Sequence, residues 1–218
     1  MTGITLSDEI KRKLPSLVLG IIESDVLTKE NDVDLLEEMQ MLSKTFKTNL
    51  SEVSNHPAIN AARMAYKHCG KDPARYRLSA EALMRRSIKG FDLPQVNNVV
   101  DLVNLISLQT GMSIGGYDAE KIDGNIVMDI GIKEDIYYAI GRGLFNIENL
   151  PVLRDRISAF GSPTSDSERT SVTLNTRKFV MIIFGFSGEI ETEQTINLSV
   201  NLLKKYAMSK EIKTVIVK

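Results

Sequence analysis

Residues 93–111 read LPQVNNVVDLVNLISLQTG, a stretch with a helical pattern but without long charged side chains. Apolar residues recur at helical spacing from Asn97 to Thr110, and Gly111 is a typical helix terminator. Between Pro94 and Ala119 the sequence holds no Lys, Arg or Glu, although a surface helix normally turns a charged face to water. We therefore predict a helix that is buried on several sides.

The polar residues of this helix form one narrow stripe. At 100° per residue, Asn97, Asp101 and Asn104 fall on one line and apolar residues cover most of the remaining circumference. A buried amide or carboxylate without a partner costs about 1 to 3 kcal/mol. Two interpretations follow. Either Asn97 and Asp101 hold the backbone of a neighbouring loop, or the stripe shapes a polar pocket together with the following loop, GMSIGGYD, whose two glycines allow close approach of a ligand or a strand.

Composition excludes several classes of protein. The chain of 218 residues is 43% hydrophobic and long enough for a sizeable core, and its 27 basic and 28 acidic side chains nearly cancel. The first 26 residues lack the order of charged and apolar regions of a signal peptide, and no apolar run approaches the roughly 20 residues of a membrane helix. One cysteine and two histidines give no disulfide framework and no zinc-type spacing. We expect a cytoplasmic protein without metal or cofactor and without a membrane partner.

The remaining segments alternate between helical and extended patterns. Helices are predicted over 31–50, 56–70, 79–90 and 191–210, and strands over 15–26, 125–132, 135–141, 178–186 and 212–218. The stretch AIGRGLFN, residues 139–146, is interpreted as a turn between strands, because it lacks the third glycine of a phosphate loop. Helices first, then strands, then a helix indicate an α+β fold rather than regular βαβ units.

Charge is distributed unevenly along the chain. Residues 63–89 carry eight basic and two acidic side chains, whereas residues 1–55 carry six basic and ten acidic ones. Within the basic segment, GKDPARYR places Arg75 and Arg77 around Tyr76, an arrangement suited to gripping phosphate and stacking on a base. The alternative interpretation is a solvated surface with ordinary salt bridges.

Three ordered motifs carry a family resemblance over roughly residues 55–185. NNVVDLVNLISLQTGMSIGGYDAEKIDG, residues 97–124, resembles a segment of the B3/4 module, the tRNA-editing domain of the phenylalanyl-tRNA synthetase beta chain. KHCGKDPARYRLSAEALMRRSIKG and FGSPTSDSERTSV resemble the stand-alone version of that module. The resemblance implies one B3/4-like α+β domain of layered sheets flanked by helices over 1–218, with 1–54 as an N-terminal strand and acidic helix and 186–218 as a C-terminal helix and strand.

The resemblance also implies a site and a partner. Its synthetase relatives hydrolyse a wrongly attached amino acid from tRNA, by positioning the ester and a water molecule rather than by a covalent nucleophile. Carried over by position, the pocket for the amino-acid moiety lies between the helix, the loop at 115–118 and the loop at 161–170. Its substrate-binding residues are Asn97, Asn98, Asp101, Gly115, Gly116, Tyr117, Asp118, Gly161, Ser165 and Thr170. The RNA-binding residues are Arg75, Tyr76, Arg77, Arg85 and Arg86, and tRNA or aminoacyl-tRNA rather than DNA is the expected partner.

The sequence also departs from the synthetase pattern. The relatives carry a histidine where this chain has Gly115, and a late glutamate where KFVMIIFGF offers only apolar residues. Asp166 and Glu168 are therefore the candidate catalytic carboxylates, which need a raised pKa or good water geometry to act as a base near neutral pH. Two functions stay open: a freestanding deacylase of mischarged tRNA, and a noncatalytic module that binds RNA or an amino acid. Neither would aminoacylate tRNA alone.

Overall fold

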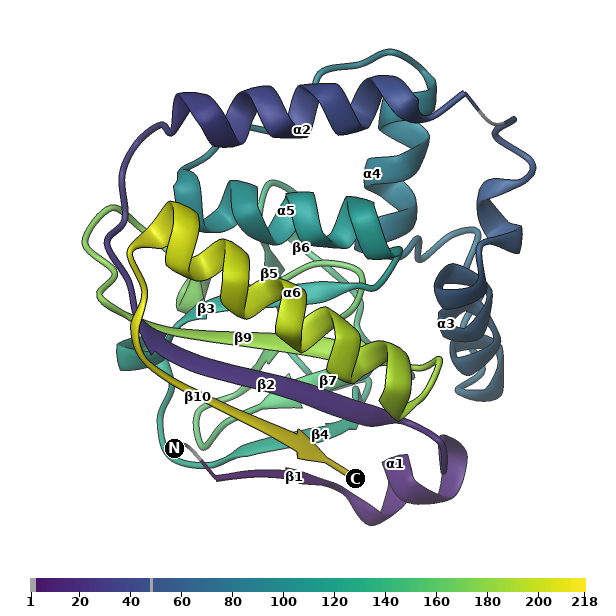
Figure 1. The fold of residues 1–218 in the computed structure, drawn as a ribbon. Coiled ribbons are helices and arrows are strands. Elements are labelled where there is room, and N and C mark those ends of the chain that lie inside the picture. The colour runs from purple at the N-terminus through teal and green to yellow at the C-terminus, as the bar shows by residue number, and fades with distance from the viewer. Residues whose placement is uncertain (1–2, 48) are drawn as a thin grey trace.

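The computed structural model describes residues 3–47 and 49–218 and is built around two four-stranded sheets (Figure 1). The first sheet has the order β10-β2-β9-β3, and every neighbouring pair in it is antiparallel. Its strands are β2 (Val18–Asp25), β3 (Ile114–Asp118), β9 (Lys178–Gly185) and β10 (Lys210–Val217). Chain segments from both ends therefore meet in one sheet.

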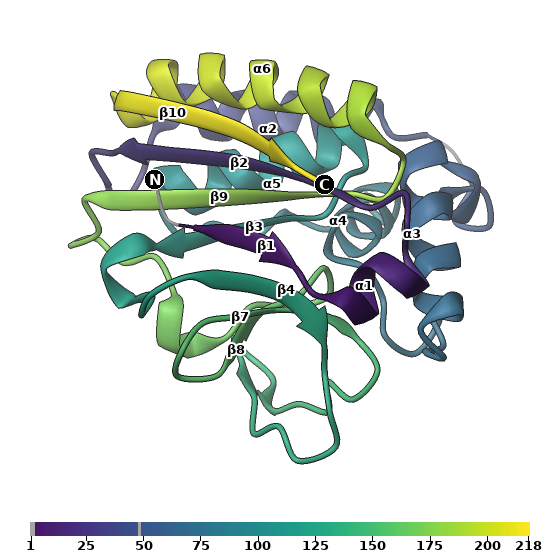
Figure 2. The ribbon, with the colours of Figure 1, turned by 90° about the horizontal axis from the view of Figure 1, so that it is seen from below.

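The second sheet packs against one face of the first sheet, and the helices cover the other face. It has the order β1-β4-β7-β8, with β1 parallel to β4 and the other pairs antiparallel. Its strands are β1 (Ile4–Leu6), β4 (Ile126–Ile130), β7 (Pro151–Arg154) and β8 (Ala159–Gly161). A small hairpin of β5 (Tyr138–Ala139) and β6 (Gly143–Leu144) projects beside it. Figure 2 shows β4, β7 and β8 on one side of the first sheet and α6 on the other.

Helices cover the other face of the first sheet. Figure 1 shows α5 and α6 side by side over the strands, with α2 packed on α5 and α4 at its end. The helices are α1 (Asp8–Lys13), α2 (Val33–Thr45), α3 (Pro57–His68), α4 (Ser79–Ile88), α5 (Asn98–Thr110) and α6 (Glu189–Ala207). Short 3-10 turns occupy η1 (Val53–Asn55), η2 (Ala119–Lys121) and η3 (Glu168–Thr170). Among the described residues no helix is long and apolar enough to cross a membrane.

Strand β9 separates two hydrophobic cores. Phe179, Met181 and Ile183 point into the core under the helices, and Val180 and Ile182 point into the core between the two sheets. Successive side chains of a strand alternate between faces, so a strand covered on both faces must be apolar throughout. This requirement explains the continuous apolar run of residues 179–184.

Most predicted elements are confirmed, as is the α+β class with layered sheets. The helix predicted over 31–50 ends at Thr45, and residue 48 within that range lies outside the described residues. Gly141 and Gly143, both with φ of 68°, form the turn predicted between strands. The sequence did not predict β1, α1, β7 and β8. These elements are three to six residues long, which is too short for a periodic pattern of apolar residues to indicate a helix or a strand.

One prediction of local structure is wrong. Residues 115–118 do not form a loop but belong to β3, which pairs with β9 from Ile114 opposite Ile183 to Asp118 opposite Phe179. Two consecutive glycines are typical of loops, yet here they lie inside a strand because neighbouring side chains occupy the space that their own would need. For Gly116, an added Cβ would lie 3.1 Å from a ring atom of Phe179 and 3.2 Å from Val103.

Helix α5 is buried on several sides, as its sequence predicts. The Asn97 side chain caps it by accepting hydrogen bonds from the backbone N–H groups of Val99 and Val100 at 3.1 and 3.0 Å. The Asp101 carboxylate accepts a hydrogen bond from the backbone N–H of Val96 at 2.9 Å. Of the two interpretations of the polar stripe, these contacts match the one in which Asn97 and Asp101 hold neighbouring backbone.

Asn98 joins three separate segments at the start of α5. Its Oδ1 accepts a hydrogen bond from the Lys29 backbone N–H at 2.7 Å. Its Nδ2 donates to the Leu27 carbonyl at 3.0 Å and to the Tyr206 carbonyl at 2.8 Å. Since Asn98 is completely buried, these bonds tie the segment after β2 and the end of α6 to α5 without help from water.

We predict that Asn98→Ala lowers the free energy of unfolding by about 2 to 4 kcal/mol, because it removes three hydrogen bonds and leaves the buried Tyr206 carbonyl without this donor. Urea denaturation followed by circular dichroism measures this loss. Asn104→Ala is the matched control on the same helix, where the half-buried side chain makes no hydrogen bond to the described residues. The control should change stability by no more than about 0.5 kcal/mol. Equal losses in the two variants would contradict the role of Asn98.

Candidate functional site

The predicted substrate-binding residues lie on two faces of the first sheet. Gly116 faces α5, as its proximity to Val103 shows. Because side chains alternate along a strand, Gly115 and Tyr117 face the opposite side, toward the second sheet. Asn97, Asn98 and Asp101 belong to α5 and lie on the helix side. Strand β3 therefore stands between the amide stripe and Tyr117, and the structure does not bring these two groups together.

Tyr117 and Asp166 form the centre of a buried polar cluster between the sheets. The Tyr117 hydroxyl donates a hydrogen bond of 2.6 Å to Oδ1 of Asp166. The Tyr117 ring packs edge-on against Phe160, with centroids 5.0 Å apart. Tyr117 itself is fully buried. A residue of β3 is thereby joined to the segment that follows β8.

Gly115 and Gly161 make room for the Tyr117 hydroxyl. A Cβ at Gly115 would lie 1.9 Å from that oxygen, and one at Gly161 would lie 2.2 Å from it. Real Cβ atoms do not approach so closely, so only glycine fits at either position while the tyrosine stays in place. The space beside Gly115 is thus filled by the Tyr117 side chain.

The loop after Gly161 is held by its own hydroxyl groups and by two further tyrosines. Ser162 Oγ donates to the Ser165 carbonyl at 2.8 Å, and Tyr137 Oη donates to the same carbonyl at 2.7 Å. Tyr66 and Thr164 share a hydrogen bond of 2.8 Å through their hydroxyls. Asp166 is half-buried beside these tyrosines: Tyr117 donates a hydrogen bond to its carboxyl group, and Tyr137 binds the carbonyl of the preceding residue.

Burial shifts the proton equilibrium of this cluster. Loss of solvent raises the pKa of Asp166 to about 7, although hydrogen bonds from Tyr117 and from the Ser162 backbone favour the ionised form. Burial, reinforced by the Asp166 charge, also raises the pKa of the Tyr117 hydroxyl well above its ordinary value. Asp166 can therefore take up or release a proton near neutral pH, which an ordinary aspartate cannot do.

The other predicted residues of this segment are placed differently. Glu168 begins η3 and is exposed, so the two candidate carboxylates do not share one environment. Thr170 is fully buried, and its hydroxyl finds no partner among the described residues. Asp118 lies on the helix side and accepts a hydrogen bond of 2.7 Å from Thr176. Of the predicted set, the structure brings together Gly115, Tyr117, Gly161, Ser165 and Asp166.

Part of the basic segment is internal. Glu81 has no exposed surface, and its carboxylate binds Arg63 at 2.9 Å and Arg85 at 2.8 Å, with Arg77 3.9 Å away. Arg85 also donates to the Leu50 carbonyl at 2.9 Å. Arg86 remains exposed and donates through Nε to the Asp92 carbonyl. Two of the eight basic side chains counted in this segment, Arg63 and Arg85, are thus closely paired with one buried carboxylate.

A second group of cations stays free at the surface. Tyr76 contacts Phe145 edge-on, with centroids 5.7 Å apart. Lys71 Nζ lies 4.3 Å from the Tyr76 centroid, Arg75 lies 5.8 Å from it, and Arg142 lies 5.6 Å from the Phe145 centroid. We call these five residues the cationic–aromatic surface. Arg142 and Phe145 were not among the predicted residues, although the stretch AIGRGLFN, interpreted only as a turn, contains both.

The cationic–aromatic surface adjoins the loop that holds Asp166. Thr164 Oγ1 donates to the Tyr76 carbonyl at 3.4 Å, and the Ser79 N–H donates to the Pro163 carbonyl at 2.8 Å. From the hairpin, the Ile140 N–H donates to the Asp166 carbonyl at 2.9 Å. The predicted RNA-binding segment and the predicted 161–170 loop are therefore neighbours in space.

Three cavities in the described part of the chain lie elsewhere. They measure about 540, 330 and 400 Å³ and are lined by α2 with α4, by α3 with α6, and by β2 with β10. None of the three is lined by a predicted substrate-binding residue. Cys69 is buried, and burial raises the pKa of its thiol to about 11, which makes it a poor nucleophile. The described residues contain no cluster of metal-binding side chains.

The raised pKa of Asp166 predicts a pH dependence of stability. The folded carboxyl releases its proton near pH 7 and the unfolded one near 3.9, so the folded chain binds more protons between these values. The free energy of unfolding therefore falls as pH rises from about 4 to about 7. The Asp166→Asn variant has no titrating proton at this position, so its free energy of unfolding should not show this part of the fall. Compared with the unmodified chain, the variant should therefore be relatively more stable at about pH 7.5 than at about pH 5.

Urea denaturation of both proteins at the two pH values tests this prediction. Burial also raises the pKa of Asp101, to about 6, but Asp101 is present in both proteins and cancels in the comparison. Parallel pH dependence of the two proteins would mean that Asp166 is ionised in the folded chain throughout this range.

A known sequence and a solved structure that are similar to this chain both come from the beta subunit of phenylalanyl-tRNA synthetase. Over 101 residues, which are 45% of this chain and 11% of the relative, the sequence is 26% identical to the phenylalanine–tRNA ligase beta subunit of Rickettsia bellii (strain RML369-C). The chain thus spans about a tenth of that relative's length.

A solved structure supports the same relationship at the level of fold. The crystal structure of an N-terminal fragment of the phenylalanyl-tRNA synthetase beta subunit from Pyrococcus horikoshii matches 99% of this chain and 51% of its own, with a TM-score of 0.52 and 16% identity. The B3/4 domain family matches residues 61–215, which is more than half of the chain. This chain belongs to the B3/4 domain family.

Proposed function

We propose that this chain is a tRNA-binding domain in which the cationic–aromatic surface holds the tRNA backbone beside the 161–170 loop. The single observation that carries the proposal is the direct contact between that surface and the loop, in which Thr164 Oγ1 donates to the Tyr76 carbonyl. Membership of the B3/4 domain family and the names of its relatives, which are tRNA synthetase subunits, support tRNA as the partner.

The chemistry of the surface suits a nucleic acid. Lys71, Arg75 and Arg142 make no ion pair with the described residues, so their charges are free to meet phosphate. Each phosphate contact releases counterions, which makes such binding strong at low salt. The neighbouring aromatic rings of Tyr76 and Phe145 offer stacking to unpaired bases. A single-stranded end of tRNA combines unpaired bases with phosphates, and it is the part of tRNA that carries an amino acid.

We predict that Arg75→Gln combined with Arg142→Gln weakens tRNA binding at least about tenfold and lowers the slope of log affinity against log salt by roughly 1.5 to 2, since two phosphate contacts are lost. Fluorescence anisotropy with labelled tRNA at several salt concentrations measures both quantities. Lys204→Gln combined with Lys210→Gln is the matched control, because it removes two exposed charges from α6 and β10. An unchanged slope in the Arg75 and Arg142 variant would rule out this surface as the tRNA contact.

Hydrolysis of mischarged aminoacyl-tRNA is a second candidate function, and the raised pKa of Asp166 favours it. A carboxyl with a pKa of about 7 is matched to general base catalysis at neutral pH. Asp166 would activate the attacking water or orient the ester through Tyr117, while Glu168 is the exposed alternative carboxylate. In the noncatalytic alternative, the same surface binds RNA and the Tyr117–Asp166 pair serves only to hold the loop.

A panel of correctly and wrongly charged tRNAs, incubated with the purified chain, separates these functions. If Asp166 is the base, one mischarged species is deacylated selectively, and Asp166→Asn slows its loss about a hundredfold at unchanged tRNA affinity. Glu168→Gln, compared in the same assay, shows which carboxylate the reaction uses. If every species survives while tRNA binding stays salt-sensitive, the chain is a noncatalytic binding domain.

A further inference from the structure

The β5–β6 hairpin carries apolar side chains on both of its faces. Exposure alternates along residues 136–140, because Tyr137 and Ala139 are buried while the residues on either side of each face water. Tyr138 lies opposite Leu144 in the ladder, so these two share the exposed face. We call this face the outer face of the hairpin. Its four side chains, which are 49 to 71% exposed, are Ile136, Tyr138, Ile140 and Leu144.

The inner face of the hairpin is covered by the chain itself. Tyr137 Oη donates a hydrogen bond of 2.7 Å to the Ser165 carbonyl, and the Ile140 N–H donates one of 2.9 Å to the Asp166 carbonyl. These bonds fix the hairpin to the 161–170 loop. The outer face is therefore held in place before a partner binds, which lowers the entropic cost of binding.

The sequence of the hairpin resembles that of a strand covered on both faces. A hairpin with one face in water normally places polar residues on that face. Residues 136–140 read IYYAI instead, a run without a charged side chain. The run of residues 179–184 in β9 is apolar because both faces of that strand are covered. In the part of the chain that the structure describes, the outer face of the hairpin is left in water, so a second molecule is its expected cover.

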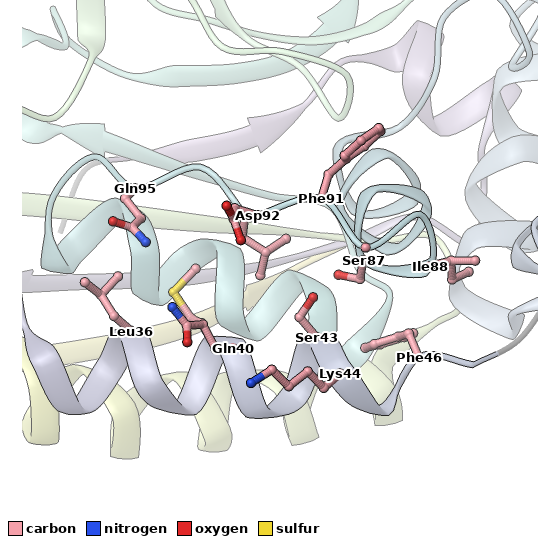
Figure 3. A pocket seen from close by; sticks show the side chains of 13 residues that line it. Leu36, Gln40, Ser43, Lys44, Phe46, Ser87, Ile88, Phe91, Asp92 and Gln95 are labelled. Atoms are coloured by element: carbon pink, nitrogen blue, oxygen red, sulfur yellow. The ribbon is translucent and has the colours of Figure 1, made fainter.

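Exposed apolar side chains on other elements are more scattered. Ile190 and Met208 lie at opposite ends of α6. Phe91 lines the cavity of about 540 Å³ between α2 and α4, and Figure 3 shows charged side chains, Lys44 and Asp92, in the same lining. By contrast, the outer face of the hairpin gathers four apolar side chains without a charge between them.

The outer face is large enough to contribute to a protein interface. Its four side chains leave roughly 500 Å² in water, within the range of the largest apolar patches on monomers, which are often functional. Two such faces packed together would bury about 1,000 Å², close to the roughly 1,200 Å² at which specific interfaces begin. Three of the four side chains are aliphatic, whereas unpaired bases stack on aromatic rings. The chemistry of this face therefore favours a protein partner over a nucleic acid.

The two ends of the hairpin carry charges of opposite sign. Glu134 lies in the turn before β5 and Arg142 in the turn after it, and each is four residues from Tyr138. Both side chains are exposed, and neither makes an ion pair with the described residues. A two-fold axis at Tyr138 would bring the Glu134 end of one hairpin to the Arg142 end of the other. The outer face and its charged ends are thus complementary to themselves.

We propose that the outer face of the hairpin binds the same face of a second copy of this chain in a symmetric dimer. The apolar side chains of one copy cover those of the other, and Glu134 of each copy pairs with Arg142 of the other. Arg142 also belongs to the cationic–aromatic surface, so tRNA would compete with this contact. The dimer is tested without RNA and does not rest on the proposed function.

Sedimentation velocity of the full chain between about 2 and 500 μM tests the proposal. We expect a monomer–dimer equilibrium with a dissociation constant of about 10 to 200 μM, because the buried area is small for a specific interface. Ile136→Asp places a charge in the interface and should weaken the dimer at least about tenfold. Ile190→Asp is the matched control, since Ile136 and Ile190 are each 70% exposed and Ile190 lies on α6. The control should leave the dissociation constant unchanged.

An exchange of charges tests the two-fold arrangement. Glu134→Arg and Arg142→Glu should each weaken the dimer about threefold or more, because like charges then meet at the ends of the hairpins. The double variant should restore the original dissociation constant to within about twofold. Lys133→Gln removes the exposed positive charge beside Glu134 and should not weaken the dimer.

A chain that stays monomeric at about 500 μM overturns the proposal, as do equal effects of Ile136→Asp and Ile190→Asp. A double charge exchange that fails to restore the dimer overturns the pairing of Glu134 with Arg142. If the chain is monomeric and Ile136→Asp weakens tRNA binding while Ile190→Asp does not, the outer face belongs to a nucleic-acid contact instead.

Discussion

The burial of α5 is the constraint on which the rest of the structure depends. This helix packs against α2, α4 and α6 and against β3, so it has no charged face to present to water. The buried side chains of Asn97, Asn98 and Asp101 each bind backbone groups, and Asn98 meets three of these on segments more than 60 positions away in the chain. Since an unpaired buried amide is costly, these bonds favour one arrangement of the helices over others of similar hydrophobic area.

A second constraint operates on the far side of the same sheet. The Tyr117 side chain occupies the space that Gly115 and Gly161 leave open, and its hydroxyl reaches Asp166. The two glycines therefore serve internal packing, and the hydrogen bond fixes the loop that follows β8. Because packing removes much of the water around the half-buried Asp166, the pKa of its carboxyl group rises toward neutral pH, so the packing that holds the loop also gives the group its proton chemistry.

The basic side chains of residues 63–89 fall into two groups, one paired with a buried carboxylate and one at the surface. Arg63 and Arg85 are drawn inward by the buried Glu81, which lies one helical turn before Arg85 on α4. Lys71 and Arg75 stay outside, held near Tyr76 by contact with its ring. The first pair supports the fold and the second supports the proposed binding of tRNA. Acidic α2 buries Leu35 and Met39 in the helical core, so the acidic N-terminal region also contributes to packing.

The sequence by itself determined the elements whose signals are local. Helical spacing and the terminator Gly111 defined α5, and the continuous apolar run of residues 179–184 defined β9, because these patterns depend only on neighbouring residues. The absence of Lys, Arg and Glu between Pro94 and Ala119 also indicated that α5 is buried. Tertiary structure alone decided that Gly115 lies in a strand, that β3 separates Tyr117 from the amide stripe, and that Arg63 and Arg85 pair with the same carboxylate of Glu81. These features depend on contacts between segments far apart in the chain, and local periodicity carries no information about them.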